Sequence, residues 1–217
     1  MKKTVVIFID VFTIFKNNQV DIESFVTLLD EFKNLGNSEC NNVVISFVVS
    51  KNINDNNIFT LCNILSSLKT LININGFYFG KILYKGDSFE LINNKLEKIK
   101  YSRINVTENI IEYIKEIDNC ESIKQIYVLD ENVSLSTYFY GFNCVNLRRL
   151  KEGNIEIPLI VFEPSVFNLR LYDNKYYGDK NNFFISLSNK SGISGILDCI
   201  NSYKENDLGK IKCLNKK

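Results

Sequence analysis

The run Val5–Ile9 consists only of β-branched and aromatic residues and is followed directly by Asp10. A run without a polar face is typical of a strand that is covered on both sides, as in a parallel sheet. Val43–Val49, interrupted only by Ser46, predicts a second buried strand, and Lys124–Leu129 predicts a further strand. The three runs therefore indicate an α/β protein rather than a helical bundle or a β-sandwich.

Amphipathic stretches separate the predicted strands. Apolar residues recur at helical spacing over residues 21–36, 55–68, 105–117 and 191–203, so we expect helices there. Strands that alternate with helices predict right-handed crossovers and a Rossmann-like, mostly parallel sheet with helices on both faces. With no linker or internal repeat, we expect one domain over residues 1–217.

Three segments depart from simple alternation. Residues 76–93 predict a β-hairpin around Gly86, which we interpret as a small insertion that serves as a cap or flap. The polar, lysine-rich stretch 94–103 is predicted to be a surface loop. Ile157–Phe162 is predicted to be an edge strand, because Pro158 lacks a backbone donor. We expect the chain from Lys204 onward to be a frayed tail.

Composition narrows the function classes. Lys and Arg number 26 against 25 Asp and Glu, for a net charge of +1. A balanced charge argues against a nucleic-acid partner and against a basic membrane-binding face. The chain has no His, which excludes Ser-His-Asp and Cys-His catalysis and zinc sites of Cys and His.

The cysteine spacing and the N-terminal residues indicate the cellular compartment. The 6 Cys form no CxxC pair, so we interpret them as free thiols in a reducing cytoplasm, with Cys62 and Cys199 on the core faces of helices. Asp10 interrupts the first apolar run, and no cleavage site follows, which argues against a secretion signal or a membrane span. We therefore expect a soluble, cytoplasmic protein.

Polar residues follow the predicted strands where an open α/β sheet binds its ligands. Asp10 follows the first strand, Ser50 the second, and Asp130 with Glu131 a later one. Carboxylates that converge at the carboxyl edge of a sheet are suitable ligands for Mg²⁺. The simpler alternative carries equal weight: an Asp after a strand often only caps a turn or a helix.

The order of these residues resembles the haloacid dehalogenase-like (HAD-like) hydrolase superfamily, over residues 4–148. VVIFIDVFTIF resembles its first motif, VVISFVVSKN its second, and IYVLDENV its fourth, with a Lys ahead of INVTENIIEYIKEI as the third. The resemblance implies Mg²⁺-dependent phosphatase chemistry on a small phosphorylated molecule. It implies these roles: Asp10 as nucleophile and metal ligand, Ser50 with Lys100 or Lys98 as phosphate ligands, and Asp130 or Glu131 as a further metal ligand.

One departure separates the chain from active phosphatases of this superfamily. They carry a second Asp two residues after the nucleophile as general acid and base, and Phe12 stands there. Losing a general acid costs ~10²–10⁴ in rate. An inactive HAD-like binding or scaffold protein with a protein partner is therefore an alternative. A PIN-like metal-dependent nuclease is a third, for which Glu131, Asp173 or Asp179 would have to converge with Asp10.

Overall fold

A computed structural model of the chain describes the following residues: 3–16, 19–35, 42–50, 52–53, 55–84, 87–100, 106–120, 122–129, 159–165, 183–187, 190 and 192–214. Helices in this part of the chain are α1 (Ile22–Leu35), α2 (Asp55–Ile74), α3 (Val106–Cys120) and α5 (Gly192–Leu214). Strands of the main sheet are β1 (Lys3–Asp10), β4 (Asn42–Val49), β5 (Tyr78–Tyr84), β6 (Asp87–Ile92), β7 (Lys95–Lys100), β8 (Ser122–Leu129), β9 (Leu159–Ser165) and β10 (Phe183–Leu187).

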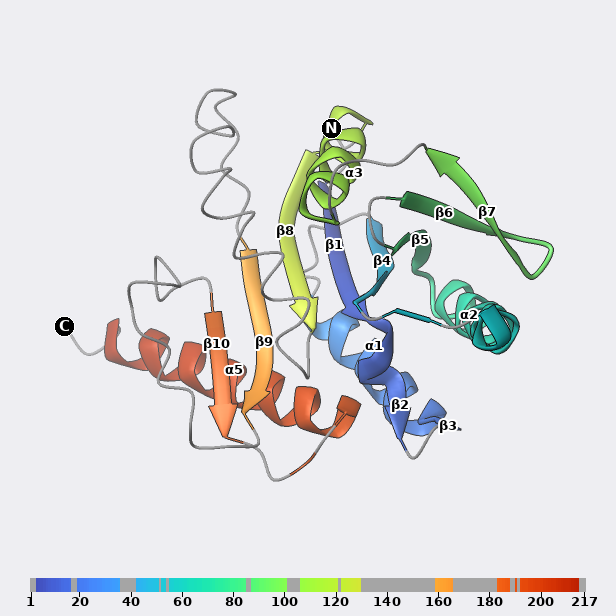
Figure 1. Cartoon of the computed structure of the whole chain (residues 1–217). Coiled ribbons are helices and arrows are strands. Elements are labelled where there is room, and N and C mark those ends of the chain that lie inside the picture. The colour runs from blue at the N-terminus through green and yellow to red at the C-terminus, as the bar shows by residue number, and fades with distance from the viewer. Residues whose placement is uncertain are drawn as a thin grey trace.

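The main sheet has eight strands in the order β10-β9-β8-β1-β4-β5-β6-β7 (Figure 1). The strands from β10 to β5 pair in parallel, whereas β6 and β7 are antiparallel to their neighbours. The predicted α/β class with a mostly parallel sheet is therefore confirmed. Going along the chain, β4 and β5 are added on one side of β1, and β8, β9 and β10 on the other. The winding thus reverses beside β1, and such a switch point is where open α/β sheets bind ligands.

Helices cover both faces of the sheet. The alternation of β1 sends Val5, Ile7 and Ile9 into a core that also contains buried residues of α1, α2 and α5. Val6 and Phe8 point to the opposite face, where they pack in a second core with residues of α3. Because β1 is apolar on both faces, it is buried along its length after Lys3. Both Cys62 and Cys199 are buried on helices, as predicted.

The edge of the sheet differs from the prediction. The hairpin of β5 and β6 is present, but β5 is also a parallel neighbour of β4 and so belongs to the main sheet. The predicted loop over 94–103 was wrong, because β7 occupies 95–100. A two-residue turn at Asn93 and Asn94, with φ of 50° and 60°, joins β6 to β7. These left-handed angles are typical of a type I′ hairpin turn, and lysines are common on exposed edge strands such as β7.

Two expectations for the C-terminal third were also wrong. β9 lies inside the sheet between β8 and β10, and it begins after Pro158, so the missing donor of that proline does not mark an edge. Helix α5 continues to Leu214, and Lys204 forms an ion pair with Glu31 of α1 rather than starting a frayed tail.

Three short elements follow β1 in the chain. A 3-10 helix, η1 (Val11–Ile14), leads into a small two-stranded sheet of β2 (Phe15–Lys16) and β3 (Gln19–Val20). The start of α5 packs against η1: a Cβ on Gly192 would lie 3.3 Å from the carbonyl oxygen of Thr13. None of the helices in the described residues is long and apolar enough to span a bilayer.

Candidate functional site

Asp10 is the last residue of β1, and its side chain is fully buried. It occupies the N-cap position of η1, and its Oδ1 accepts a hydrogen bond of 3.4 Å from the backbone N–H of Phe12. The backbone of Asp10 is still extended, with φ of -63° and ψ of 123°, and its side chain offers an acceptor to the first turn of η1. The capping role that we weighed for Asp10 is thus present, and any chemistry at this residue would come in addition to it.

Ser50 lies one residue beyond β4, and the structure brings it to Asp10 as predicted. Its hydroxyl Oγ donates a hydrogen bond of 2.9 Å to the same Oδ1 of Asp10. The two strands are parallel neighbours, and Asp10 is paired with Val48. The carboxyl ends of both strands therefore meet at one edge, which places the side chain of Ser50 over the end of β1.

The predicted acidic partners of Asp10 follow β8. Ile9 is paired in register with Leu129, the last residue of β8, so this strand ends beside β1 at the same edge of the sheet. Asp130 and Glu131 themselves lie outside the described residues.

The predicted phosphate-binding lysines are not brought to Asp10. Lys98 lies on β7 and forms an ion pair of 2.8 Å with Asp87. Strands β4, β5 and β6 lie between β1 and β7, which at ~4.8 Å a step amounts to roughly 19 Å. Lys100 is the last residue of the same strand; its backbone is equally far, and its side chain lies outside the described part. The prediction failed because it rested on a loop that is in fact an edge strand.

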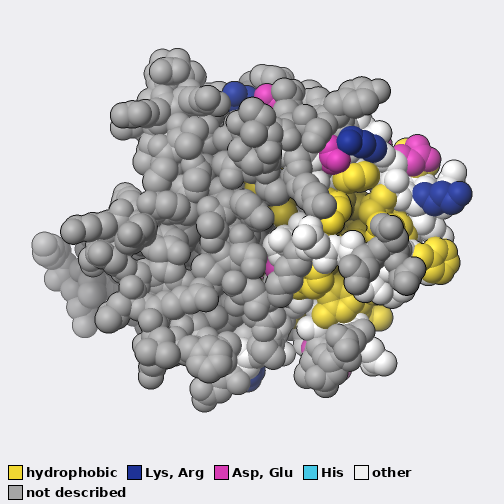
Figure 2. Space-filling view, in the orientation of Figure 1, with side chains coloured by type: hydrophobic (Ala, Val, Ile, Leu, Met, Phe, Trp, Pro, Cys, Tyr) yellow, Lys and Arg dark blue, Asp and Glu magenta, His cyan; other side chains and the backbone are white. Residues whose placement is uncertain are grey.

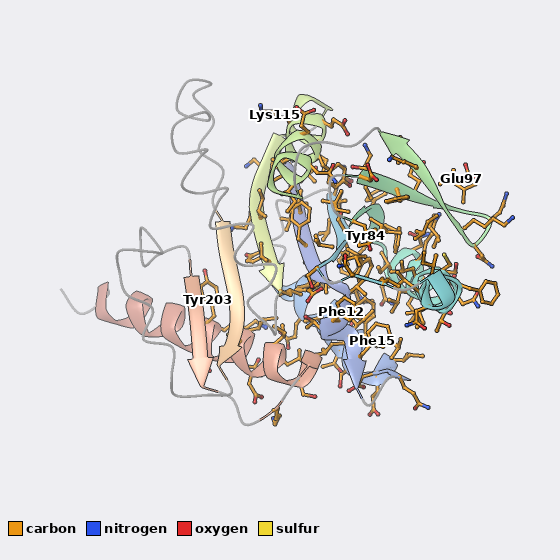
Figure 3. All side chains as sticks on the ribbon, in the orientation of Figure 1. Phe12, Phe15, Tyr84, Glu97, Lys115 and Tyr203 are labelled. Atoms are coloured by element: carbon orange, nitrogen blue, oxygen red, sulfur yellow. The ribbon has the colours of Figure 1, made fainter. Side chains whose placement is uncertain are left out.

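A cavity of about 480 Å³ opens beside the end of β1. Its lining consists of apolar and neutral polar side chains, namely Val11, Phe12, Phe15, Asn52, Ile53, Asn57, Thr60, Leu61 and Ile64. Figure 2 shows hydrophobic side chains gathered over η1, β2 and α2, and Figure 3 shows Phe12 and Phe15 on the η1–β2 segment next to α2. We refer to this cavity as the η1–α2 pocket.

The η1–α2 pocket was not predicted from the sequence, although part of its signal is there. The sequence NINDNN at 52–57 is rich in asparagine; residues 52 and 53 precede α2, and Asp55 begins it. Segments that follow a strand at the carboxyl edge of a sheet commonly carry binding residues. The backbone N–H of Ile53 donates a hydrogen bond of 3.4 Å to the hydroxyl of Tyr84, the last residue of β5. This bond ties the segment before α2 to a neighbouring strand end and so fixes one wall of the pocket.

The residues present are compatible with Mg²⁺ but do not form a complete site. Among the described residues, no group of three or more Asp, Glu, Cys or His side chains gathers in one place. Mg²⁺ needs only one or two protein carboxylates, because water and phosphate oxygens fill its remaining positions. Asp10 could therefore supply one ligand, and of the predicted ligands only this one lies in the described part.

Comparisons with protein-family models, with curated proteins and with solved structures gave no match for this chain.

Proposed function

We propose that this chain is a divergent HAD-like phosphohydrolase that uses Asp10 to act on a small phosphorylated molecule with Mg²⁺. The contact between Asp10 and Ser50 carries the proposal. It places a carboxyl group and a hydroxyl group together at the carboxyl edge of the sheet, beside the strand where the winding reverses and next to a cavity. Such an edge is the usual ligand site of an open α/β sheet.

The chemistry follows from the two side chains. A carboxylate oxygen of Asp10 attacks phosphorus, the bond from phosphorus to the leaving-group oxygen breaks, and an aspartyl phosphate forms. Water then attacks that phosphorus, which releases inorganic phosphate and restores the carboxylate. The hydroxyl of Ser50 donates a hydrogen bond to a phosphoryl oxygen while the substrate is bound. Mg²⁺, held by Asp10 with Asp130 or Glu131, would neutralise phosphate charge.

The leaving oxygen must take its proton from water in this scheme, because Phe12 has none to give. The expected activity is thus lower by ~10²–10⁴ than that of a phosphatase with a positioned acid. The hairpin of β5 and β6 as a cap over the site stays a prediction.

A second candidate is a HAD-like binding or scaffold protein without catalysis. The burial of Asp10 favours it, because a carboxyl group with no exposed surface is reached by a substrate only when atoms around it move. Phe12 also packs partly against the core, as a structural residue would. The PIN-like alternative depends on Glu131, Asp173 and Asp179, all of which lie outside the described residues.

The deciding experiment compares Asp10→Asn with the wild type on a panel of phosphate monoesters with Mg²⁺. Asparagine keeps an Oδ1 acceptor for Ser50 and for the N–H of Phe12, so the fold is retained while the nucleophile is lost. Asp21→Asn is the matched control, since Asp21 caps α1 by accepting from the N–H of Ser24 at 3.1 Å. We expect turnover to fall at least 100-fold in Asp10→Asn and to stay within twofold in the control.

Trapping of the covalent adduct gives a second readout. Rapid quenching followed by intact-mass measurement is expected to show a phosphoryl group on the wild type and on Asp21→Asn but none on Asp10→Asn. A wild-type protein that is folded, binds no Mg²⁺ in calorimetry and turns over no ester would contradict the phosphohydrolase and support the binding protein.

A further inference from the structure

The lining of the η1–α2 pocket has a particular chemical character. Two phenylalanines, Phe12 and Phe15, stand on one side with their ring centroids 6.4 Å apart and their planes inclined by 35°. Leu61 and Ile64 of α2 add aliphatic surface on the other side. Flat apolar walls of this kind favour a planar ring over a hydrated, fully polar group such as a sugar alone.

Three polar side chains interrupt the apolar surface. Asn52 and Asn57 each offer an amide, which donates and accepts hydrogen bonds, and Thr60 offers a hydroxyl. All three are neutral, and no charged side chain is among the described residues of the lining. An anionic or cationic ring would find no counter-charge among these described residues. The two amides and the hydroxyl belong to exposed residues, so the polar edges of a ligand can replace the water that they bind.

The pocket is also continuous with the Asp10 site along the chain. Val11 and Phe12 follow Asp10 directly, and Asn52 is two residues beyond Ser50. At about 480 Å³ the cavity lies within the ~300–1,000 Å³ of small-molecule pockets. It is thus large enough for a ring system of the size of a nucleobase.

We propose that the η1–α2 pocket binds a neutral, planar heteroaromatic group with hydrogen-bonding edges, and that the substrate is a nucleoside phosphate. The position of the phosphate in this inference rests on the proposed function, whereas the binding of the ring depends only on the pocket. Phe12, at the position of the missing general acid, then has a binding role: its ring contacts the base.

Calorimetry and saturation-transfer NMR with adenosine, guanosine, cytidine and uridine test the pocket without any phosphate. We expect at least one nucleoside to bind to the wild type with a Kd below a few millimolar, and ribose not to bind. Asn57→Leu removes one amide at similar volume and is expected to weaken binding about five- to tenfold. Asn63→Leu, on the same helix but outside the lining, is the matched control and is expected to bind as the wild type.

Asp10→Asn separates this inference from the proposed function. It is expected to lose Mg²⁺ binding and turnover and to keep the nucleoside affinity, because the nucleoside carries no phosphate. If the wild type binds a nucleoside but neither Mg²⁺ nor phosphate esters, the proposed ligand of the pocket is supported and the proposed phosphohydrolase activity is contradicted. If a folded wild type binds none of the nucleosides, or if Asn57→Leu and Asn63→Leu bind equally, the proposed ligand class is wrong.

Discussion

The hydroxyl of Ser50 donates a hydrogen bond of 2.9 Å to Oδ1 of Asp10, and this bond joins the carboxyl ends of β4 and β1. Oδ1 also accepts from the N–H of Phe12, so one oxygen serves both the strand contact and the cap of η1. The stability of this edge therefore depends on an oxygen that the proposed chemistry would also use.

Replacing Ser50 by Ala is expected to lower the free energy of unfolding by ~1–2 kcal/mol, because a fully buried carboxyl group loses a hydrogen-bond donor. Urea unfolding followed by circular dichroism measures the change. Ser67→Ala is the matched control, since Ser67 is exposed on α2 and its hydroxyl bonds only within the helix. An equal effect of the two substitutions would contradict a structural role for the Ser50–Asp10 contact.

A second close contact fixes the middle of β5. The pairing of β4 with β5 shifts between Ile45 and Phe47, where β5 carries one residue more than β4. The hydroxyl of Tyr113 on α3 accepts a hydrogen bond of 3.1 Å from the N–H of Lys81 at this bulge, and Ser46 bonds to the same oxygen at 3.2 Å. Tyr113 thus satisfies a backbone donor that the bulge removes from the ladder.

Gly80→Ala is expected to destabilise the protein by ~1–3 kcal/mol, because the added methyl has no space. A Cβ at this position would lie 2.1 Å from Oγ of Ser46 and 2.6 Å from the hydroxyl oxygen of Tyr113. Thermal unfolding measures the loss. Ser46→Ala removes the nearest atom, so the double variant should be more stable than the sum of the two single changes predicts; strict additivity would show that the bulge accommodates the methyl elsewhere.

Alkaline pH gives a separate test of Tyr113. Burial raises the pKa of its hydroxyl above the ordinary value of 10.0, and the hydrogen bonds from Ser46 and Lys81 oppose the shift only in part. Above about pH 10 the unfolded chain releases this proton while the folded chain keeps it. The free energy of unfolding is thus expected to fall by up to about 1.4 kcal/mol per pH unit from this group, between its ordinary and its raised pKa.

Tyr113→Phe removes the titrating group, so its stability should fall less steeply than that of the wild type over the same pH range. Urea unfolding at a series of pH values measures the two slopes. Tyr78→Phe is the control, because the side chain of Tyr78 is exposed to solvent. Parallel slopes for the wild type and Tyr113→Phe would contradict the expected shift.

The sequence predicted the strands and strand ends that depend on the local pattern of apolar residues. Continuous apolar runs identified β1, β4 and β8, and because parallel strands end at one edge, the strand-end residues Asp10 and Ser50 could be expected to meet. The order of strands beyond this depends on contacts between distant segments, which no local pattern encodes. For that reason the edge position predicted for Ile157–Phe162 is wrong, and β9 lies inside the sheet.

The parts of the site that the sequence did not predict were missed for physical reasons. Lysines in a polar stretch are equally typical of a loop and of an exposed edge strand, so the sequence alone does not separate a site position from an edge position for Lys98. The turn at Asn93 and Asn94 was the available signal, since Asn tolerates left-handed angles. The η1–α2 pocket lies between the η1–β2 segment and the first turns of α2, and its size depends on the packing of segments that are distant in the sequence.

Phe12→Asp tests whether the chain keeps the rest of a phosphatase site. If Asp10 is a nucleophile, a carboxyl group two residues later supplies the missing proton to the leaving oxygen, and turnover of phosphate monoesters should be at least tenfold higher than in Phe12→Asn, which lacks the ring equally. Phe12→Asn is the matched control: it removes the same partly buried ring, which packs against the core, but has no proton to transfer at neutral pH. Both variants are expected to lose stability, by ~1–3 kcal/mol, because each places a polar group where a ring packed. The comparison between them therefore isolates the acid from the loss of packing. A higher rate in Phe12→Asp alone supports the phosphohydrolase with a lost acid, and equal rates in the two variants show that Asp10 is not poised to attack phosphorus.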